Sequence, residues 1–458
     1  MSLIRLRKTY IKIIVICMLL WIVCQLLLTN DKSSTKSKAS NFQTYLEFKD
    51  KISRQKYDVN CRSIFEMDKN EIEKAKSLLG KLKSNSINSL VKILDDKNYI
   101  FEQYHCPLFR KIRDYDRFNT TNNHFSLAYS ILTYSNTEQF ERLLKLIYHP
   151  NNIYCIHIDS KSTLEFKQSI KSIVDCFDNI FISSKLEDVF YASFNRLQAD
   201  INCLNDLFNL DSLILNNENF KNKKNYKWKY FLNFASSEFP LRTNSEIIRI
   251  LQVYNGSNEI EIIKKFNSAR INIKWKVDPN ENKLIPTNEN KTSVPHGFKI
   301  VKGYAYIVAS RKFAEYVFYD QKSRDLLEWS KDTWSPDEWY WSTLHYNTKY
   351  FSESGFKDIE NSDRINTLSR FAGWGGEYKC KGKWRHGVCV FSIEDLPEMI
   401  TRPHFVANKF LLEYDPISYQ CMEEWYLQRE TIQTPINMFY YCQFLKTHSS
   451  ILKCPFGF

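Results

Sequence analysis

The stretches FSLAYSILTY at residues 125–134 and NIYCIHID at residues 152–159 are near-continuous apolar runs of strand length. Residues 137–148 between them, TEQFERLLKLIY, predict a helix. A strand, a helix and a second strand in this order, with near-continuous apolar strands, are typical of a parallel βαβ unit. We therefore expect an α/β fold built on a parallel sheet.

The chain after this unit continues to alternate helices and strands. Residues 192–207 predict a further helix and residues 230–234 a further strand, which a loop at residues 236–240 follows. No Pro/Gly-rich linker, internal repeat or shift in composition marks a second domain. Asp159 ends the second strand of the βαβ unit, and ligands bind beyond the carboxyl ends of such strands. We therefore expect one α/β catalytic domain, with Asp159 placed where a nucleotide binds.

The N-terminus has the pattern of a membrane anchor. Residues 13–29 form an apolar run after a basic segment, residues 1–12, and the run is near the length that crosses a bilayer. A cleaved signal peptide is the alternative, but no small-x-small cleavage site follows the run. The basic residues favour a cytoplasmic N-terminus. We expect a polar stem at residues 30–58 and a lumenal domain at residues 59–458, with a helical extension to about residue 120.

Cysteine usage and charge fit a lumenal protein. Of the twelve cysteines, ten lie beyond the apolar run, which predicts a disulfide framework, and no CxxC pair or His cluster predicts a zinc site. The sequons at Asn119, Asn255 and Asn290 are candidate N-glycosylation sites. The net charge of +12 is spread without an arginine-rich run, so it does not indicate nucleic-acid binding. A mildly basic surface does suit an anionic ligand such as a nucleotide sugar.

The octet WSPDEWYW at residues 334–341 places carboxylates among four aromatic rings, as carbohydrate sites do. Taken alone, Ser335, Pro336 and Glu338 also predict a helix start, because Ser caps, Pro suits the first helical position and Glu reaches back in a capping box. Neighbouring side chains on a helix point about 100° apart. We therefore expect at most one of Asp337 and Glu338 to face a site.

Five ordered blocks together resemble the core 2 β-1,6-N-acetylglucosaminyltransferases, type II Golgi membrane enzymes of glycosyltransferase family 14. The resemblance extends from Cys61 to about Cys421. The blocks are YCIHIDSKS at 154–162, YAS at 191–193, QAD at 198–200, WSPDE at 334–338 and FVANKF at 405–410. This resemblance implies a GT-A-like, Rossmann-related glycosyltransferase domain, and it implies that Glu338 is the catalytic base.

The resemblance also implies catalysis without a metal cofactor. The D-x-D sequence at residues 114–116, which holds a metal in most GT-A enzymes, precedes the first core strand and is expected to be a surface turn. Fixed basic side chains then stabilise the departing UDP, and Lys409 is one of them by resemblance. The second is an arginine whose position is taken by His386 here, with Arg385 one residue early. Either Arg385 reaches the diphosphate by a local bulge or His386 substitutes, since a one-residue slip in a strand reverses the side chain.

Substrate-binding residues follow from the same resemblance. Asp159 and Tyr191 match residues that contact the uridine part of the donor. Glu259, Arg270 and Trp374 match acceptor-binding residues, with structural roles as the open alternative for each. The family's lysine between the first two is Asn267 here, a family tyrosine is Gly376, and a free cysteine near the donor is Ala235. We therefore expect a changed acceptor pocket.

The cysteine pairing is also implied by resemblance. Cys442 and Cys454 lie beyond the family pattern, and either pair together or link two chains in a homodimer. The implied disulfides are Cys61 with Cys421, Cys106 with Cys176, Cys155 with Cys203 and Cys380 with Cys389.

The leading hypothesis is an inverting, metal-independent transferase. It moves N-acetylglucosamine from UDP-N-acetylglucosamine to the 6-hydroxyl of GalNAc in core 1 O-glycans of glycoproteins, in the Golgi lumen. A UDP-glucose-dependent glucosyltransferase is a near alternative, whereas the WSPDE block argues against a xylosyltransferase. A catalytically silent, membrane-anchored lectin is the alternative from another class.

Overall fold

The computed structural model describes residues 46–54, 56–83, 93–118, 125–210, 227–278, 280, 281, 283–359 and 361–454. The predicted cytoplasmic tail and anchor, residues 1–29, and the sequon at Asn119 lie outside these residues. No helix in the described part of the chain combines the length and apolar content that a bilayer crossing requires. Residues 1–53, with a short helix at 46–51, and residues 54–458 form two separate units, and the second holds the site described below.

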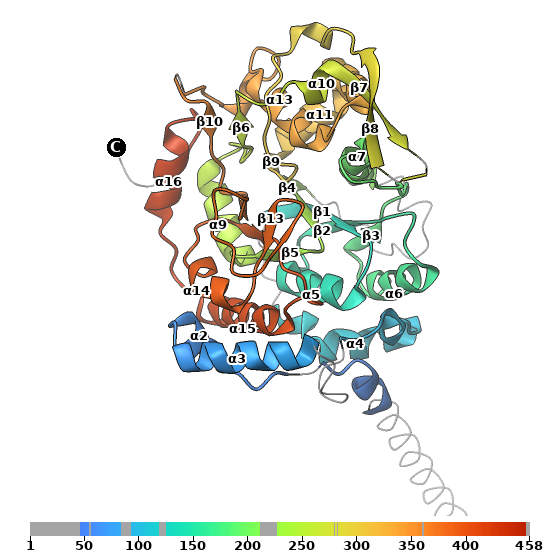
Figure 1. The fold of residues 1–458 in the computed structure, drawn as a ribbon, viewed down its shortest axis with the longest axis vertical. Coiled ribbons are helices and arrows are strands. Elements are labelled where there is room, and N and C mark those ends of the chain that lie inside the picture. Colours follow the sequence, from blue (N-terminus) through green and yellow to red (C-terminus); the bar gives the residue numbers. More distant parts are fainter. Residues whose placement is uncertain are drawn as a thin grey trace, which may run out of the picture. The chain divides into compact units, whose positions relative to one another are not determined.

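A five-stranded sheet forms the centre of the second unit, in the order β3-β2-β1-β4-β9 (Figure 1). The first four strands are parallel, and the last pairs with β4 in the antiparallel direction. Nearly all side chains of β1 and β2 are buried, which explains their continuous apolar sequences. The predicted parallel α/β core is confirmed. The strands are β1 Ser126–Thr133, β2 Ile153–Ile158, β3 Ile180–Ile182, β4 Trp228–Ala235 and β9 Val308–Ser310.

Helices connect the parallel strands, as crossover connections require. The connecting helices are α5 Thr137–Ile147, α6 Leu164–Val174 and α7 Phe194–Phe208. Asn136 caps α5 by accepting a hydrogen bond from the Gln139 amide, and Thr163 caps α6 in the same way. The predicted helix at 137–148 is therefore confirmed, and the one predicted from residue 192 begins two residues later.

A second, three-stranded sheet corrects one prediction. Its order is β11-β14-β5, formed by Arg370–Ala372, Val406–Asn408 and Glu238–Pro240. The expected loop at 236–240 thus contains a strand, which pairs antiparallel with β14. Three residues are too few to show a strand period, and Pro240 is tolerated because β5 lies at the edge of its sheet.

The remaining elements are three short strand pairs and eleven further α-helices outside the two sheets, counted over the residues that the structure describes. Three short strand pairs are β6 Ile262–Ile263 with β10 Arg364–Ile365, β7 Ile273–Asp278 with β8 Lys283–Asn290, and β12 Lys383–Arg385 with β13 Val388–Val390. Further helices are α2 Cys61–Phe65, α3 Lys69–Lys83, α4 Cys106–Ile112, α9 Asn244–Tyr254, α10 Ala269–Asn272, α11 Arg311–Tyr319, α12 Gln321–Trp329, α13 Tyr340–Tyr346, α14 Leu396–Met399, α15 Pro416–Ile432 and α16 Met438–Lys446.

The N-terminal helices pack against the C-terminal part of the chain. Figure 1 shows α2 and α3 along α14 and α15, and the four helices share an apolar core. Tyr57, which lies in the predicted stem, is buried, and its amide donates to Gln420 Oε1 at 2.7 Å. The folded unit therefore begins before residue 59.

All ten cysteines beyond the predicted anchor form disulfides in the structure. Cys442 and Cys454 pair within the chain, so neither is left to link two chains. The other bridges have the expected pairing, Cys61–Cys421, Cys106–Cys176, Cys155–Cys203 and Cys380–Cys389.

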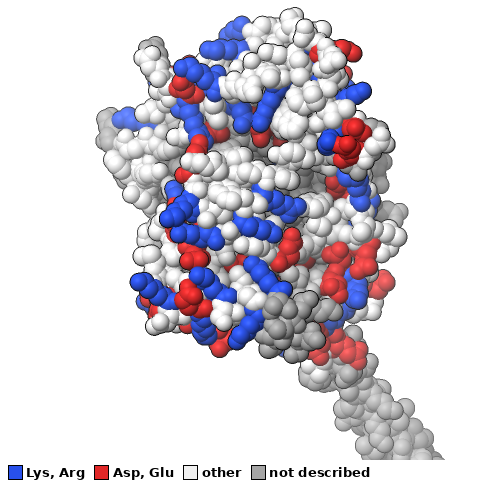
Figure 2. Space-filling view, in the orientation of Figure 1, with Lys and Arg blue, Asp and Glu red and all other residues white. Residues whose placement is uncertain are grey.

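Charged side chains are distributed over the surface. Figure 2 shows Lys and Arg interspersed with Asp and Glu on this face, without one continuous basic patch.

Candidate active site

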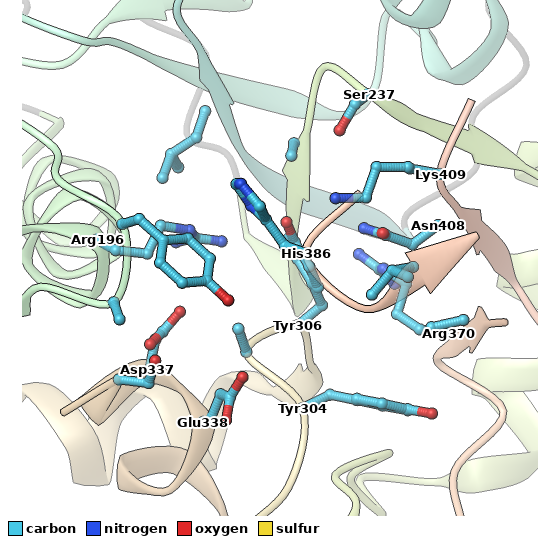
Figure 3. A pocket seen from close by; sticks show the side chains of 18 of the residues that line it. Arg196, Ser237, Tyr304, Tyr306, Asp337, Glu338, Arg370, His386, Asn408 and Lys409 are labelled. Carbon is cyan, nitrogen blue, oxygen red and sulfur yellow. The ribbon is translucent and has the colours of Figure 1, made fainter. Parts of the chain in front are cut away.

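A cavity of about 660 Å³ opens at the carboxyl ends of the parallel strands. Thr133 ends β1 and Tyr134 follows it, Asp159 follows β2, and Ala235 ends β4, and all four line the cavity. Figure 3 shows Asp337 and Glu338 on one side of this pocket and Lys409 on the opposite side. The pocket therefore lies where parallel α/β sheets bind ligands.

The segment before Glu338 has a different local structure from the predicted one. Ser335 has φ 44° in the left-handed region and makes no capping hydrogen bond through its side chain. Pro336–Glu338 form only a 3₁₀ turn, η6, and α13 begins at Tyr340. The predicted capping box is therefore wrong. Instead, the Ser335 amide donates to the carbonyl of Ala192 at 2.8 Å, which brings the WSPDE and YAS blocks together.

Glu338 is held by two cations. Its Oε2 lies 3.2 Å from Arg270 Nη1 and 3.2 Å from Lys302 Nζ. Its backbone carbonyl accepts a hydrogen bond from the Gly303 amide at 2.6 Å. Position 303 requires glycine, since a Cβ there would lie 2.2 Å from the carbonyl oxygen of Glu261. Both contacts of the carboxylate use Oε2, so Oε1 is the oxygen available to a substrate.

Asp337 also lines the pocket, which corrects the expectation that only one of the two carboxylates would. The expectation assumed a regular helix, whereas the segment is a 3₁₀ turn after a left-handed residue. Burial raises the pKa of Asp337 to about 7, against the opposing effect of Arg196. Its Oδ1 is buried without a hydrogen-bond partner among the described residues.

The β12–β13 hairpin, between Cys380 and Cys389, carries Arg385 and His386 into the pocket. Its turn is His386-Gly387, with φ 53° and 75°, and the Cys380–Cys389 disulfide closes its base. Because this turn departs from an extended strand, Arg385 and His386 both line the cavity. A diphosphate contact from Arg385 and one from His386 are therefore compatible with each other.

These two residues form a cation cluster with Lys409, which follows β14. Burial lowers the pKa of Lys409, and Arg385 lowers it further, while Glu238 opposes the shift. The pKa of His386 is lowered by burial and by its neighbours Lys409 and Arg385. Arg385 Nη2 donates to the hydroxyl of Tyr134 at 3.3 Å. Close like charges of this kind favour an anionic ligand.

The expected donor residues both line the cavity. Asp159 Oδ1 accepts a hydrogen bond from the Lys161 amide at 2.9 Å, which fixes its side chain. Tyr191 is 61% exposed, and its ring centroid lies 4.5 Å from that of His386. The tyrosine therefore lies between the cation cluster and Trp334, whose ring lies 6.4 Å away.

Of the expected acceptor residues, the structure places two at the site. Trp374 lines the pocket and Arg270 contacts Glu338. Glu259 is the exception, because it is 1% exposed and accepts hydrogen bonds from Tyr254, Thr367 and the Leu368 amide. Its carboxylate is bonded within the protein and does not line the cavity, whereas Glu261, two residues later, does.

Several residues in and beside the pocket were not assigned a role from the sequence. Arg370 and Glu238 form a buried ion pair at 2.9 Å, and Asn408 donates to the same Glu238 oxygen at 3.1 Å. Lys302 and Tyr304 also line the cavity, on either side of the required Gly303. Gly303 is the local feature of the sequence that could have indicated a close backbone approach next to Lys302 and Tyr304. The Arg370–Glu238 pair joins residues 132 apart, so sequence reasoning had no access to it.

The remaining predicted positions lie away from the pocket. Asp114 and Asp116 are exposed at a turn, as expected, and neither lines the cavity. Among the described residues, no three His, Cys, Asp or Glu side chains are grouped as a metal site would require. Asn290 is exposed at the end of β8. Asn255 is also exposed, but its Nδ2 donates to the Ile451 carbonyl at 2.7 Å.

Comparisons with known proteins agree with this architecture. The model of the Core-2/I-Branching enzyme family matches residues 127–400. The chain is 33% identical over 391 residues to the beta-1,3-galactosyl-O-glycosyl-glycoprotein beta-1,6-N-acetylglucosaminyltransferase 3 of Homo sapiens, covering 82% of this chain and 84% of the relative. The chain is also 33% identical to the enzyme of the same name from Mus musculus, covering 82% of this chain and 84% of the relative. Identity and both coverages are the same for the beta-1,3-galactosyl-O-glycosyl-glycoprotein beta-1,6-N-acetylglucosaminyltransferase of Bovine herpesvirus 4 (strain LVR140). The chain therefore belongs to the Core-2/I-branching enzyme family and is a glycosyltransferase.

Proposed function

We propose that the protein is an inverting β-1,6-N-acetylglucosaminyltransferase with a GT-A-like, Rossmann-related domain. It transfers N-acetylglucosamine from UDP-N-acetylglucosamine to the 6-hydroxyl of GalNAc in core 1 O-glycans. The observation that carries the proposal is the arrangement of Figure 3, in which the Glu338 carboxylate lies across the pocket from Lys409. A base and a cation on opposite sides of one cavity match a single displacement.

The proposed reaction uses Glu338 as its base. Glu338 Oε1 accepts the proton of the acceptor 6-hydroxyl while the oxygen forms a bond to the anomeric carbon of the donor. The bond from that carbon to the β-phosphate oxygen breaks, and its electron pair leaves with UDP. Attack from the face opposite UDP converts the α-linked donor to a β-linked product.

The leaving diphosphate is stabilised by protein cations in this proposal. Lys409, Arg385 and His386 line one side of the cavity. Besides burial, repulsion among these three side chains lowers the pKa of Lys409 and of His386. An incoming diphosphate relieves that repulsion and gains charge-assisted hydrogen bonds. We infer that no metal cofactor is required, because Lys409 and Arg385, together with His386 once it is protonated, can offset the diphosphate charge.

Donor and acceptor assignments rest on pocket residues and on the relatives. In this proposal Asp159 and Tyr191, which line the cavity, bind the uridine part, and Trp374 and Arg270 bind the acceptor, the first from the cavity wall and the second beside Glu338. The relatives named above are N-acetylglucosaminyltransferases, which supports N-acetylglucosamine over glucose as the transferred sugar.

We also propose a Golgi setting. The apolar run at residues 13–29 would anchor the chain as a single-pass type II protein with the catalytic domain in the lumen. Five disulfides are typical of an oxidising compartment, which supports this placement. Asn290 is the exposed sequon that an oligosaccharide would reach without breaking a hydrogen bond recorded in the structure.

Incubation of the purified full-length chain with UDP-sugars and Galβ1,3GalNAc-benzyl tests the proposal. We expect transfer from UDP-N-acetylglucosamine, with a β-1,6 linkage to GalNAc in the product by NMR. Transfer from UDP-glucose and not from UDP-N-acetylglucosamine would contradict the proposed donor and make UDP-glucose the donor. Acceptor binding without transfer from any donor would contradict the proposed enzyme activity.

A further inference from the structure

Asp337 is a pocket carboxyl group that the proposed mechanism leaves unused. It lines the cavity directly before Glu338, and the residue is only 7% exposed. Its Oδ1 is buried and has no hydrogen-bond partner within the described part of the chain. A buried polar oxygen without a partner costs free energy until a ligand or a water molecule binds it. Asp337 therefore has a hydrogen-bonding position that the protein itself does not fill.

Arg196 of α7 lies on the same side of the pocket as Asp337, as Figure 3 shows, but it is held by another carboxylate. Arg196 Nη1 donates to Asp200 Oδ2 at 2.7 Å. Asp200 is itself fixed at the sheet, because it accepts hydrogen bonds from Ser130 of β1 at 2.7 Å and from Asn233 of β4 at 2.8 Å. Arg196 Nη2 is buried and has no hydrogen-bond partner among the described residues. Asp337 and Arg196 therefore offer an acceptor and a donor on one wall of the cavity.

The charges around Asp337 favour a neutral ligand group. Burial raises the pKa of Asp337 to about 7, and Arg196 opposes the rise. The nearby carboxylates of Glu338 and Asp200 add to it. A phosphate would meet three carboxyl groups here and one guanidinium that is already paired. A sugar hydroxyl meets no such repulsion, because it can donate to a carboxyl oxygen and accept from a guanidinium.

The position of Asp337 indicates which sugar it meets. In the proposed reaction the transferred sugar lies between the base at Glu338 and the diphosphate at Lys409. The turn that carries Asp337 is bonded through the Ser335 amide to the segment of Tyr191, at the expected uridine site. Asp337 is buried whereas Glu338 is half-buried, so Asp337 lies deeper than the base. The acceptor stays attached to its polypeptide outside the pocket, and the sugar at the deeper position is therefore the transferred one.

We propose that Asp337 and Arg196 bind hydroxyl groups of the transferred sugar and determine which UDP-sugar the enzyme uses. One hydroxyl donates to Asp337 Oδ1, and a sugar oxygen accepts from Arg196 Nη2. A donor that lacks this hydroxyl, or carries it in another configuration, leaves the two buried groups unpaired and is rejected. This inference rests on the proposed function, because it places a UDP-sugar between Glu338 and Lys409.

Calorimetric titration of the full-length chain with UDP and with UDP-N-acetylglucosamine, without an acceptor, tests the sugar contact. In Asp337→Ala we expect the affinity for UDP-N-acetylglucosamine to fall by about tenfold, the size expected for one lost hydrogen bond to a charged group. The affinity for UDP should stay within about twofold, because the cations at the diphosphate are unchanged, and this value also shows that the variant is folded. Equal losses for UDP and UDP-N-acetylglucosamine would overturn the proposal, and so would no loss for either. Asp58→Ala is the matched control, because the Asp58 side chain is fully exposed and does not line the cavity.

Donor analogues identify the hydroxyl that Asp337 binds. UDP-N-acetylglucosamine with its 3-, 4- or 6-hydroxyl replaced by hydrogen would be titrated into the wild-type chain and into Asp337→Ala. We expect one analogue to bind the wild-type chain about tenfold more weakly than the parent donor does. The same analogue should bind Asp337→Ala as tightly as the parent does, because its partner is already missing. If each analogue loses the same factor in both proteins, Asp337 contacts none of these hydroxyls and the proposal fails.

Rates of transfer to Galβ1,3GalNAc-benzyl separate this inference from the proposed function. If UDP-N-acetylglucosamine binds through Asp337 but no sugar is transferred, the proposed reaction fails and the sugar contact stands. If transfer occurs, we expect Asp337→Ala to reduce the preference for UDP-N-acetylglucosamine over UDP-N-acetylgalactosamine by about tenfold. Transfer with an unchanged preference and unchanged donor affinity would leave the proposed function standing and overturn the role of Asp337.

Discussion

The two sides of the pocket are built in opposite ways. On one side, Glu338 is already neutralised within the protein, by Arg270 and Lys302 at 3.2 Å each. On the other side, Lys409, Arg385 and His386 are close together, and burial and mutual repulsion lower the pKa of Lys409 and of His386. The first side is complete in the protein alone, whereas the second gains stability from a bound anion.

This difference shows how the charges of the reaction are divided. A base must keep one position and one free oxygen, and two salt bridges at Oε2 provide both. A leaving-group site must bind negative charge more strongly as it develops, and closely spaced cations provide that. Changes on the base side should therefore act on turnover, and changes on the cation side on donor binding and departure of UDP.

The largest effect is expected for Glu338→Gln. The amide cannot accept the acceptor proton, so kcat/KM should fall by about 10³-fold, within the range for a lost general base. The affinity for UDP, measured by calorimetry, should stay within about twofold, because the change leaves the cation side intact. Glu66→Gln, an exposed glutamate on the far α2 terminus, is the matched control. Activity within tenfold of wild type would remove Glu338 as the base.

A smaller effect is expected when Glu338 loses one cation. In Arg270→Met or Lys302→Met the carboxylate keeps only one of its two contacts at Oε2 and is held less firmly, so kcat should fall by about tenfold. The affinity for UDP should stay within about twofold, because the cation side is unchanged. The conservative Lys302→Arg should restore the wild-type kcat. A fall in UDP affinity as large as the fall in kcat would contradict this positioning role.

The smallest effect is expected from His386. Its lowered pKa keeps it mostly neutral at neutral pH, and a bound diphosphate favours the protonated form against Lys409 and Arg385. The affinity for UDP should therefore rise by about threefold as pH falls from 7.5 to 5.5. In His386→Gln this pH dependence should vanish, and in His386→Arg the affinity should be high at both pH values. Calorimetric titrations at the two pH values provide the measurement, and a wild-type affinity that falls in acid would contradict the assignment.

The parallel core could be predicted from sequence because its signal is local. Both faces of β1 and β2 are buried, so each strand is a continuous apolar run that ends in a polar residue at the site. Glu338, Lys409, Asp159 and Tyr191 were placed by short blocks that resemble a family, and the structure brings all four to one cavity. Their roles remain predictions until the variants are measured.

The acceptor side could not be predicted in the same way. Glu259 and Glu261 differ by two residues and both are buried, and the tertiary contacts of Glu259 with Thr367 and Leu368 decide that only Glu261 lines the cavity. The turn at His386 depends on two left-handed residues, which a strand argument cannot anticipate. Arg364 reaches Glu261 across 103 residues of sequence. Side-chain contacts over such separations follow from the tertiary fold and leave no pattern in the chain.

The contrast between the two sides is tested most directly by initial rates with and without a metal. Wild-type protein and Lys409→Met would be assayed with UDP-N-acetylglucosamine and Galβ1,3GalNAc-benzyl in excess EDTA and again with Mn²⁺. If protein cations stabilise the leaving group, wild-type rates are unchanged by EDTA, and Lys409→Met is slower by about 10²-fold in both conditions. Loss of wild-type activity in EDTA with recovery in Mn²⁺ would contradict the account.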